Sequence, residues 1–175
     1  MPPTSDKLPQ RYFVIDSCIL EYLLRKEMID PILQQLDMWR GNYLEIGISE
    51  ITYAELLDGA YRDKELKVIE LIEKLYSFSI SKSVLKTAGK LGSIYKQEFG
   101  AEKGISIGDK IIAATSIIHG APIVTANIKD FPQPFFRVIK NKNIIYRKDS
   151  SDRMIYIAVL YPNYDYINYS FKARH

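Results

Sequence analysis

Cysteine and histidine, the residues that most often bind zinc or act as nucleophiles, are scarce in this 175-residue chain. The single cysteine, Cys18, excludes an internal disulfide framework and any zinc site built from several thiolates. The two histidines, His119 and His175, are too few for a histidine-rich metal site. Any catalytic metal must therefore be held by oxygen ligands, and the low cysteine content predicts a reducing, cytoplasmic location.

Long hydrophobic runs are also missing. No apolar segment approaches the roughly 20 residues that span a bilayer, and the first six residues lack the basic and apolar regions of a signal peptide. Hydrophobic residues make up 47% of the chain and charged residues 26%, which is typical of a globular protein. We therefore expect one compact domain with a short extension, and no membrane partner.

Positive charge gathers at the end of the chain, although the formal net charge is only +3. Residues 1–139 carry 17 basic and 18 acidic side chains, whereas residues 140–175 carry 7 basic and 3 acidic ones. Six of the 13 tyrosines also lie in this last segment. Such a mixture is found where proteins contact nucleic acid. It is also typical of a tyrosine-rich edge strand or docking arm, which is the interpretation that we favour.

Short apolar segments alternate with segments of helical periodicity. The predicted strands cover residues 12–15, 44–48, 78–80 and 122–125, with small edge strands at 136–139 and 143–146 and a further strand at 154–161. The predicted helices cover residues 19–24, 31–39, 51–60, 64–76, a segment capped by Ser83, and 111–118. A loose lead-in occupies residues 2–10. The pattern predicts an α/β fold: a three-layer α/β/α sandwich with a central, mostly parallel sheet, plus a strand-forming C-terminal extension.

Acidic residues recur at the ends of these elements. Asp16 directly follows the first strand, Glu55 lies on the helix after the second strand, and Asp109 opens the most apolar helix. Asn127 and Asp130 follow the 122–125 strand. Ligands of open α/β sheets bind outside the carboxyl ends of the strands, so these side chains are expected to converge. Clustered carboxylates repel one another unless a cation neutralises them, and oxygen ligands favour Mg²⁺ or Mn²⁺.

Each of these residues also has an ordinary structural explanation. Asp16 could cap the helix that follows it. Asp109 lies three residues after Ser106, the spacing of a capping box. Glu55 could be a solvated helix residue, and Asn127 and Asp130 could be turn residues that bond their own backbone.

The local contexts of the acids, taken together, are more specific. They are Phe13-Val14-Ile15-Asp16-Ser17, Thr52-Tyr53-Ala54-Glu55-Leu56, Gly108-Asp109-Lys110-Ile111-Ile112-Ala113-Ala114 and Ile123-Val124-Thr125-Ala126-Asn127. In order and spacing this set resembles the PIN-domain family, and within it the VapC-like toxins of toxin–antitoxin pairs. The resemblance covers residues 11–148 as a PIN-like nuclease domain and leaves residues 149–175 as a tyrosine-rich basic extension packed on or beside it.

The resemblance implies a Mg²⁺- or Mn²⁺-dependent ribonuclease. Asp16, Glu55 and Asp109 match the family's metal ligands, and Asn127 matches a fourth position that is often Asp. That departure removes one charge and leaves open whether one metal or two are bound. Ser17, Thr125 and Asp130 are possible supporting residues.

In the implied reaction, water attacks an RNA phosphodiester in line and expels the 3′-oxygen, which leaves a 5′-phosphate and a 3′-hydroxyl. The resemblance further implies an RNA substrate, a cognate antitoxin protein and a homodimer. The sequence does not identify the RNA or the antitoxin.

Two other functions remain possible from the sequence. One is a catalytically weak PIN scaffold that serves as a protein- or RNA-binding module, which the Asn at position 127 and the extra C-terminal segment support. The other is an α/β phosphotransfer protein. Against the latter, the chain has no Gly-rich phosphate loop ending in Gly-Lys-Ser/Thr, and Asp16-Ser17-Cys18 lacks the second Asp of haloacid-dehalogenase-type phosphatases.

Overall fold

The computed structural model describes residues 12–40, 45–59, 63–100 and 104–173, so the expected lead-in at 2–10 lies outside the described residues. Within them, one six-stranded sheet has the order β3-β2-β1-β4-β6-β5. Four strands are mutually parallel: β1 (Tyr12–Ile15), β2 (Glu45–Ser49), β3 (Tyr76–Phe78) and β4 (Ile123–Thr125). The last two, β5 (Phe136–Lys148) and β6 (Ser151–Pro162), are antiparallel to their neighbours. The predicted α/β class with a mostly parallel sheet is confirmed.

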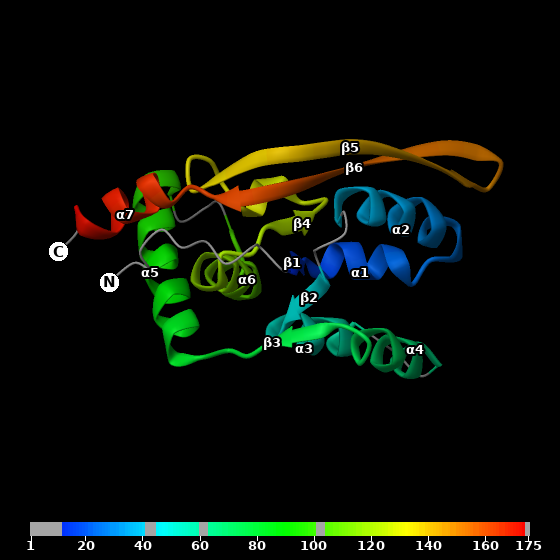
Figure 1. The fold of residues 1–175 in the computed structure, drawn as a ribbon, viewed down its shortest axis with the longest axis horizontal. Coiled ribbons are helices and arrows are strands. Elements are labelled where there is room, and N and C mark those ends of the chain that lie inside the picture. Colours follow the sequence, from blue (N-terminus) through cyan, green and yellow to red (C-terminus); the bar gives the residue numbers. More distant parts are fainter. Residues whose placement is uncertain (1–11, 41–44, 60–62, 101–103, 174–175) are drawn as a thin grey trace.

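Helices cover both faces of the sheet (Figure 1). On one face a hydrophobic cluster joins the sheet to α1 (Ser17–Leu23), α2 (Lys26–Arg40), α3 (Glu50–Asp58) and α4 (Asp63–Ile72). On the other face a second cluster joins it to α5 (Lys82–Phe99), α6 (Ile107–His119) and α7 (Tyr164–Lys172). Neighbouring strand residues alternate between the two clusters because successive side chains of a strand point to opposite faces. The three layers predicted from the sequence are therefore present.

The most apolar helix, α6, begins four residues before the predicted range of 111–118 and ends one residue after it, and both ends carry capping residues. Its N-terminus carries a capping box, in which the Ser106 hydroxyl accepts from the backbone N–H of Asp109 and the Asp109 carboxylate accepts from the backbone N–H of Ser106. Its C-terminus ends at Gly120, whose φ of +66° is the left-handed conformation that glycine adopts without steric cost. Ile112, Ala113 and the residues around them are buried against the sheet.

The end of the chain builds a long β-hairpin that extends past α2 in Figure 1. The two small edge strands predicted at 136–139 and 143–146 are one continuous strand, β5, interrupted only by a register shift between Val138 and Lys140. The strand predicted at 154–161 is confirmed as β6, which lies inside the sheet between β4 and β5. The turn at Asp149 and Ser150 has positive φ at both residues, as tight hairpins require. The boundary expected at 148/149 falls at this turn.

Three local predictions were wrong. Helix α2 begins at Lys26 rather than at Pro31, because Met28 is fully buried and brings the preceding turn into the core. Ser81, not Ser83, caps α5: its hydroxyl accepts from the backbone N–H of Val84. Strand β3 lies two residues earlier than expected, where it pairs with β2. Among the described residues, no helix has the length and apolar content that a bilayer crossing needs.

The segment after β6 forms helix α7 rather than an extended tail. Its N-terminal end is attached to the C-terminal end of α6, where the Tyr164 hydroxyl donates to the Ile117 carbonyl oxygen at 2.9 Å. The Tyr166 hydroxyl lies 3.1 Å from a carboxylate oxygen of Glu98 on α5. These contacts favour the structural interpretation of this segment over a role in nucleic-acid binding. They hold α7 beside the C-terminal end of α6, whereas Asp109 lies at the N-terminal end of that helix.

Candidate active site

The predicted site lies where the parallel strands β1 and β4 end side by side. Asp16 follows β1 directly, and Thr125 is the last residue of β4. The parallel register places Ile15 beside Val124, so the next residues of both strands meet at the carboxyl edge of the sheet. There the Thr125 hydroxyl donates to Asp16 Oδ2 at 2.6 Å. The two strand ends thus fix the carboxylate of Asp16 through a short, buried hydrogen bond.

Asp16 carries a buried carboxyl group, with only 2% of the residue exposed to water. Burial raises its pKa, and the negative charge of Asp109 raises it further. Hydrogen bonds from Thr125, Cys18 and Ser17 act in the opposite direction by stabilising the ionised form. The expected capping of α1 by the Asp16 side chain does not occur, because the side chain makes no capping hydrogen bond to the helix. The Asp16 carboxylate instead accepts hydrogen bonds from Thr125, Cys18 and Ser17.

Cys18 is a part of this site that the sequence analysis did not assign. Its thiol donates to Asp16 Oδ2 at 3.1 Å, and the backbone N–H of Ala126 donates to its sulfur at 3.4 Å. Burial raises the pKa of this thiol, and the adjacent Asp16 raises it further, so it remains protonated and acts as a donor. The spacing Asp16-x-Cys18 at the start of a helix was the available signal.

Asp109 has the capping role that the sequence left open, and its role as a site residue stays a prediction. Its Oδ2 accepts from the Ser106 hydroxyl at 2.6 Å within the capping box. Its negative charge also raises the pKa values of Asp16, Glu55 and Asp130. The carboxyl groups of four separate elements therefore share one electrostatic environment. The cap explains the position of Asp109, and the like-charge repulsion indicates that it lies near the other acids.

Glu55 reaches this cluster from α3 by lying against the first turn of α6. A Cβ atom placed on Gly108 would collide with Glu55 Oε1, so a larger residue there would displace this carboxylate from its position. Burial raises the pKa of Glu55, while the Ser17 hydroxyl lowers it and Asp109 and Asp16 raise it. Its Oε2 atom is buried and has no hydrogen-bond partner among the described residues. An unsatisfied buried carboxylate oxygen is costly unless a ligand engages it.

Asn127 and Asp130 belong to the turn that follows β4. The backbone N–H of Asn127 donates to the Thr125 hydroxyl at 2.8 Å, and its side-chain amide donates to the Asp130 carboxylate. Burial raises the pKa of Asp130, and the charge of Asp109 raises it further. A pocket of about 320 Å³ is lined by Gly104, Asp109, Lys129 and Asp130. Asp130, expected only as a supporting residue, therefore lies directly on the acidic pocket.

The geometry brings these acids near one another without closing a cage around an ion. Among the described residues, no three Asp, Glu, His or Cys side chains are close enough to enclose a metal. This arrangement is compatible with Mg²⁺, which usually keeps several waters and binds proteins through one or two carboxylates. The sequence analysis missed the role of Gly108, which is to leave space for the Glu55 side chain. This role becomes visible only when α3 is seen packed against α6.

Comparison with known proteins shows which family and which proteins this chain is similar to. A model of the PIN domain matches residues 13–134. Ribonuclease VapC19 of Mycobacterium tuberculosis is 31% identical over 120 residues, which cover 68% of this chain and 91% of that protein. Ribonuclease VapC1 of Rickettsia felis is 37% identical over 102 residues, which cover 52% of this chain and 72% of that protein.

Solved structures with the same fold include toxin–antitoxin complexes. VapBC2 from Rickettsia felis, bound to a DNA fragment from its promoter, superposes with a TM-score of 0.59 at 25% identity and covers 69% of this chain and 90% of that chain. A toxin–antitoxin complex from Klebsiella pneumoniae superposes with a TM-score of 0.55 at 26% identity, and the match covers 70% of this chain and 92% of that chain. The family match, the relatives and the site at the ends of β1 and β4 agree, and the chain belongs to the PIN-domain family.

Proposed function

We propose that this protein is a divalent-metal-dependent ribonuclease and the toxin of a toxin–antitoxin pair. The observation that supports the proposal is that Asp16, Glu55 and Asp130 lie near enough to Asp109 for its negative charge to raise the pKa of each of them. Such mutual repulsion is unfavourable for the fold alone and is relieved by a bound cation. The named relatives are ribonucleases, which sets the expected substrate class.

The residues present fit Mg²⁺ or Mn²⁺. All candidate ligands are oxygen atoms, and Glu55 Oε2 is buried without a hydrogen-bond partner in the described part of the chain. Asp16, Asp109 and Glu55 would hold the ion, one or two of them directly and the others through water, and Asn127 or Asp130 would also contribute through water. Bound there, the ion would polarise the scissile phosphate and lower the pKa of the attacking water.

The proton acceptor, the groups that position Asp16 and a phosphate contact are all side chains of this chain. Glu55 has a raised pKa and a free Oε2 lone pair, so this atom can accept the proton of the attacking water. Thr125, Ser17 and Cys18 hold the Asp16 carboxylate in place through donated hydrogen bonds. Lys129 lines the acidic pocket and can contact a phosphate oxygen. Attack forms the water oxygen–phosphorus bond and breaks the bond to the 3′-oxygen, which leaves 5′-phosphate and 3′-hydroxyl ends.

The partners follow from the same comparisons. The solved relatives were captured as toxin–antitoxin complexes, so we infer a cognate antitoxin that binds this chain and restrains its activity. A homodimer is part of the same proposal.

The decisive experiment measures RNA cleavage by the purified protein with Mg²⁺ or Mn²⁺ and with a chelator. We expect cleavage only with metal, loss of cleavage in Asp16→Asn, and full activity in Asp37→Asn, which removes an exposed carboxylate that pairs with Arg40 on the surface. Sequencing of the RNA ends should find 5′-phosphates and 3′-hydroxyls. Cleavage that persists in the chelator would refute the metal mechanism. An intact fold that binds RNA and never cleaves it would favour a catalytically weak scaffold.

A further inference from the structure

The β5–β6 hairpin extends well beyond the carboxyl edge of the parallel sheet. Thr125, the last residue of β4, pairs with Ala158, and β6 continues past this pair from Ile157 back to Ser151. At about 3.3 Å per residue, this free part of β6 is about 23 Å long. Because β4 and β1 are parallel, the hairpin projects from the same edge at which Asp16 lies. We call residues 140–157 the arm.

The two faces of the arm differ. One face carries Ile144 and Ile157, which are buried in the hydrophobic cluster that includes α1 and α2 and against which the partly buried Trp39 packs. The opposite face continues the side of the sheet on which Thr125 and Ala158 lie. Its cross-strand pairs are Asn143 with Tyr156, Ile145 with Met154, and Arg147 with Asp152.

The site-side face of the arm is exposed, with 40% of Tyr156, 68% of Ile145 and 61% of Met154 accessible. Tyr156 lies two residues along β6 from the Thr125–Ala158 pair, which puts its Cα roughly 8 Å from that of Thr125. Since Thr125 donates to Asp16, this exposed face begins directly beside the carboxylate cluster.

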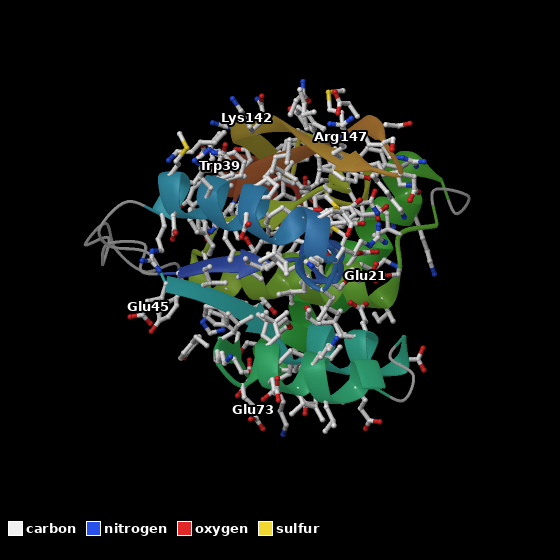
Figure 2. All side chains as sticks on the ribbon, turned by 90° about the vertical axis from the view of Figure 1, so that its right-hand side faces the viewer. Glu21, Trp39, Glu45, Glu73, Lys142 and Arg147 are labelled. Carbon is white, nitrogen blue, oxygen red and sulfur yellow. The ribbon has the colours of Figure 1, made fainter. Side chains whose placement is uncertain are left out.

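The arm is also the positive part of the molecule. It contains five basic residues against two acidic ones, a net charge of +3, which equals the net charge of the whole chain. The rest of the chain is therefore neutral overall. Figure 2 shows Lys142 and Arg147 on the hairpin, at the side of the molecule opposite Glu73. By the strand register, Lys140, Lys142, Lys148 and Arg153 lie on the face that carries Ile144 and Ile157, and the site-side face carries Arg147 opposite Asp152. The hairpin as a whole therefore supplies a positive field beside the acidic site, and Arg147 is the basic side chain that belongs to the site-side face.

We propose that the arm binds single-stranded RNA through the face carrying Tyr156, Asn143 and Arg147 and leads the strand to the carboxylate site; this rests on the proposed ribonuclease function. An exposed tyrosine gives a base a surface for stacking, asparagines offer hydrogen bonds to base edges, and arginine neutralises phosphate. The arm lies outside residues 13–134, the part of the chain that matches the PIN-domain model. It would therefore give this protein a substrate contact of its own.

The test measures binding of a fluorescently labelled oligouridylate to the full chain in a chelator, where cleavage is suppressed, over a series of salt concentrations. We expect Tyr156→Ala to weaken binding by about fivefold or more, since stacking on an aromatic side chain contributes about 1–3 kcal/mol per base. Arg147→Glu should weaken binding and reduce the salt slope by about 0.7 for each phosphate that the variant no longer neutralises. The matched controls are Tyr169→Ala on α7 and Lys86→Glu on α5, both exposed, which should bind as the wild type does.

Thermal unfolding of each variant, matched to the wild type, shows that the arm variants are folded. The proposal is overturned if folded Tyr156→Ala and Arg147→Glu bind RNA with wild-type affinity and slope, or if they lose only the capture of an antitoxin, which would make the arm a protein-docking surface. Cleavage by the wild type with Mn²⁺ is measured in parallel. If RNA binding depends on the arm but the wild type does not cleave RNA, the proposed ribonuclease activity is refuted and RNA binding by the arm stands. If the wild type cleaves RNA but the arm variants bind it normally, RNA binding by the arm is refuted and the ribonuclease activity stands.

Discussion

Replacing Asp16 by asparagine should change the stability of the protein in opposite directions with and without a divalent cation. Asp16 is buried, and its pKa is raised above 3.8, first by burial and then by Asp109. The folded state therefore binds this proton more tightly than the unfolded state does. The contribution of Asp16 is most favourable below pH 3.8 and is lost as the pH rises through the folded-state pKa. At neutral pH in a chelator, Asp16→Asn should accordingly unfold at a higher temperature than the wild type.

A bound divalent cation should reverse this order of Tm between the wild type and Asp16→Asn. A ligand that binds only the folded state at 100 times its Kd stabilises it by about 2.7 kcal/mol. For a chain of this size, about 1 kcal/mol corresponds to a shift of about 2–4 °C in Tm. Saturating Mn²⁺ should thus raise the Tm of the wild type by about 5–10 °C and leave that of Asp16→Asn nearly unchanged.

Differential scanning calorimetry of both proteins, in chelator and in Mn²⁺, measures these four Tm values. Asp37→Asn is the matched control and should follow the wild type throughout, because Asp37 is exposed. In the chelator, the difference between wild type and Asp16→Asn should shrink as the pH is lowered toward 3.8. Two results would contradict this account of Asp16: a variant that is the less stable protein in the chelator at neutral pH, or an equal rise of both Tm values with Mn²⁺.

Three further predictions concern other residues of the structure. Glu55→Gln should lower kcat by about 10²-fold or more without lowering Tm, as measured by single-turnover cleavage, because it removes the proton acceptor from a site where its charge is repelled. Asn127→Asp should destabilise the metal-free protein, because it replaces the amide that bonds to Asp130 by a second carboxylate. The same variant should bind Mn²⁺ more tightly in calorimetric titration, and Asp130→Asn should change that affinity less. His119, which packs on Phe78, has a pKa lowered by burial, so stability should fall slightly as the pH drops below 6.5, and His119→Gln should remove this dependence in chemical denaturation.

Each of these predictions can be contradicted directly. Near-normal kcat in Glu55→Gln would assign the proton transfer elsewhere. A larger loss of Mn²⁺ affinity in Asp130→Asn than the gain in Asn127→Asp would make Asp130 the fourth ligand. An unchanged pH profile in His119→Gln would show that another group titrates below pH 6.5.

Local patterns in the sequence were sufficient for the parts of the protein that neighbouring residues decide. The capping box of Ser106 and Asp109, the apolar run that follows it and Gly120 at its end together define α6. The order of acids at element ends likewise predicted that Asp16 and Asp109 face one region, because parallel strands present their carboxyl ends at one edge.

Contacts between distant segments decided the rest. The pairing of β6 with β4 joins residues about 35 positions apart, and no local pattern distinguishes it from β5 pairing there instead. The segment after Pro162 has the aromatic content of a strand, yet it is helical because Tyr164 and Tyr166 bond to α6 and α5. The room that Gly108 leaves for Glu55 exists only once α3 and α6 are packed. Periodicity and capping act within a few residues, so the sequence determined α6 and the placement of Asp16 at the end of β1. The start of α2, the position of β3, the strand order, the arm and the fit of Glu55 depend on which surfaces meet in the folded chain.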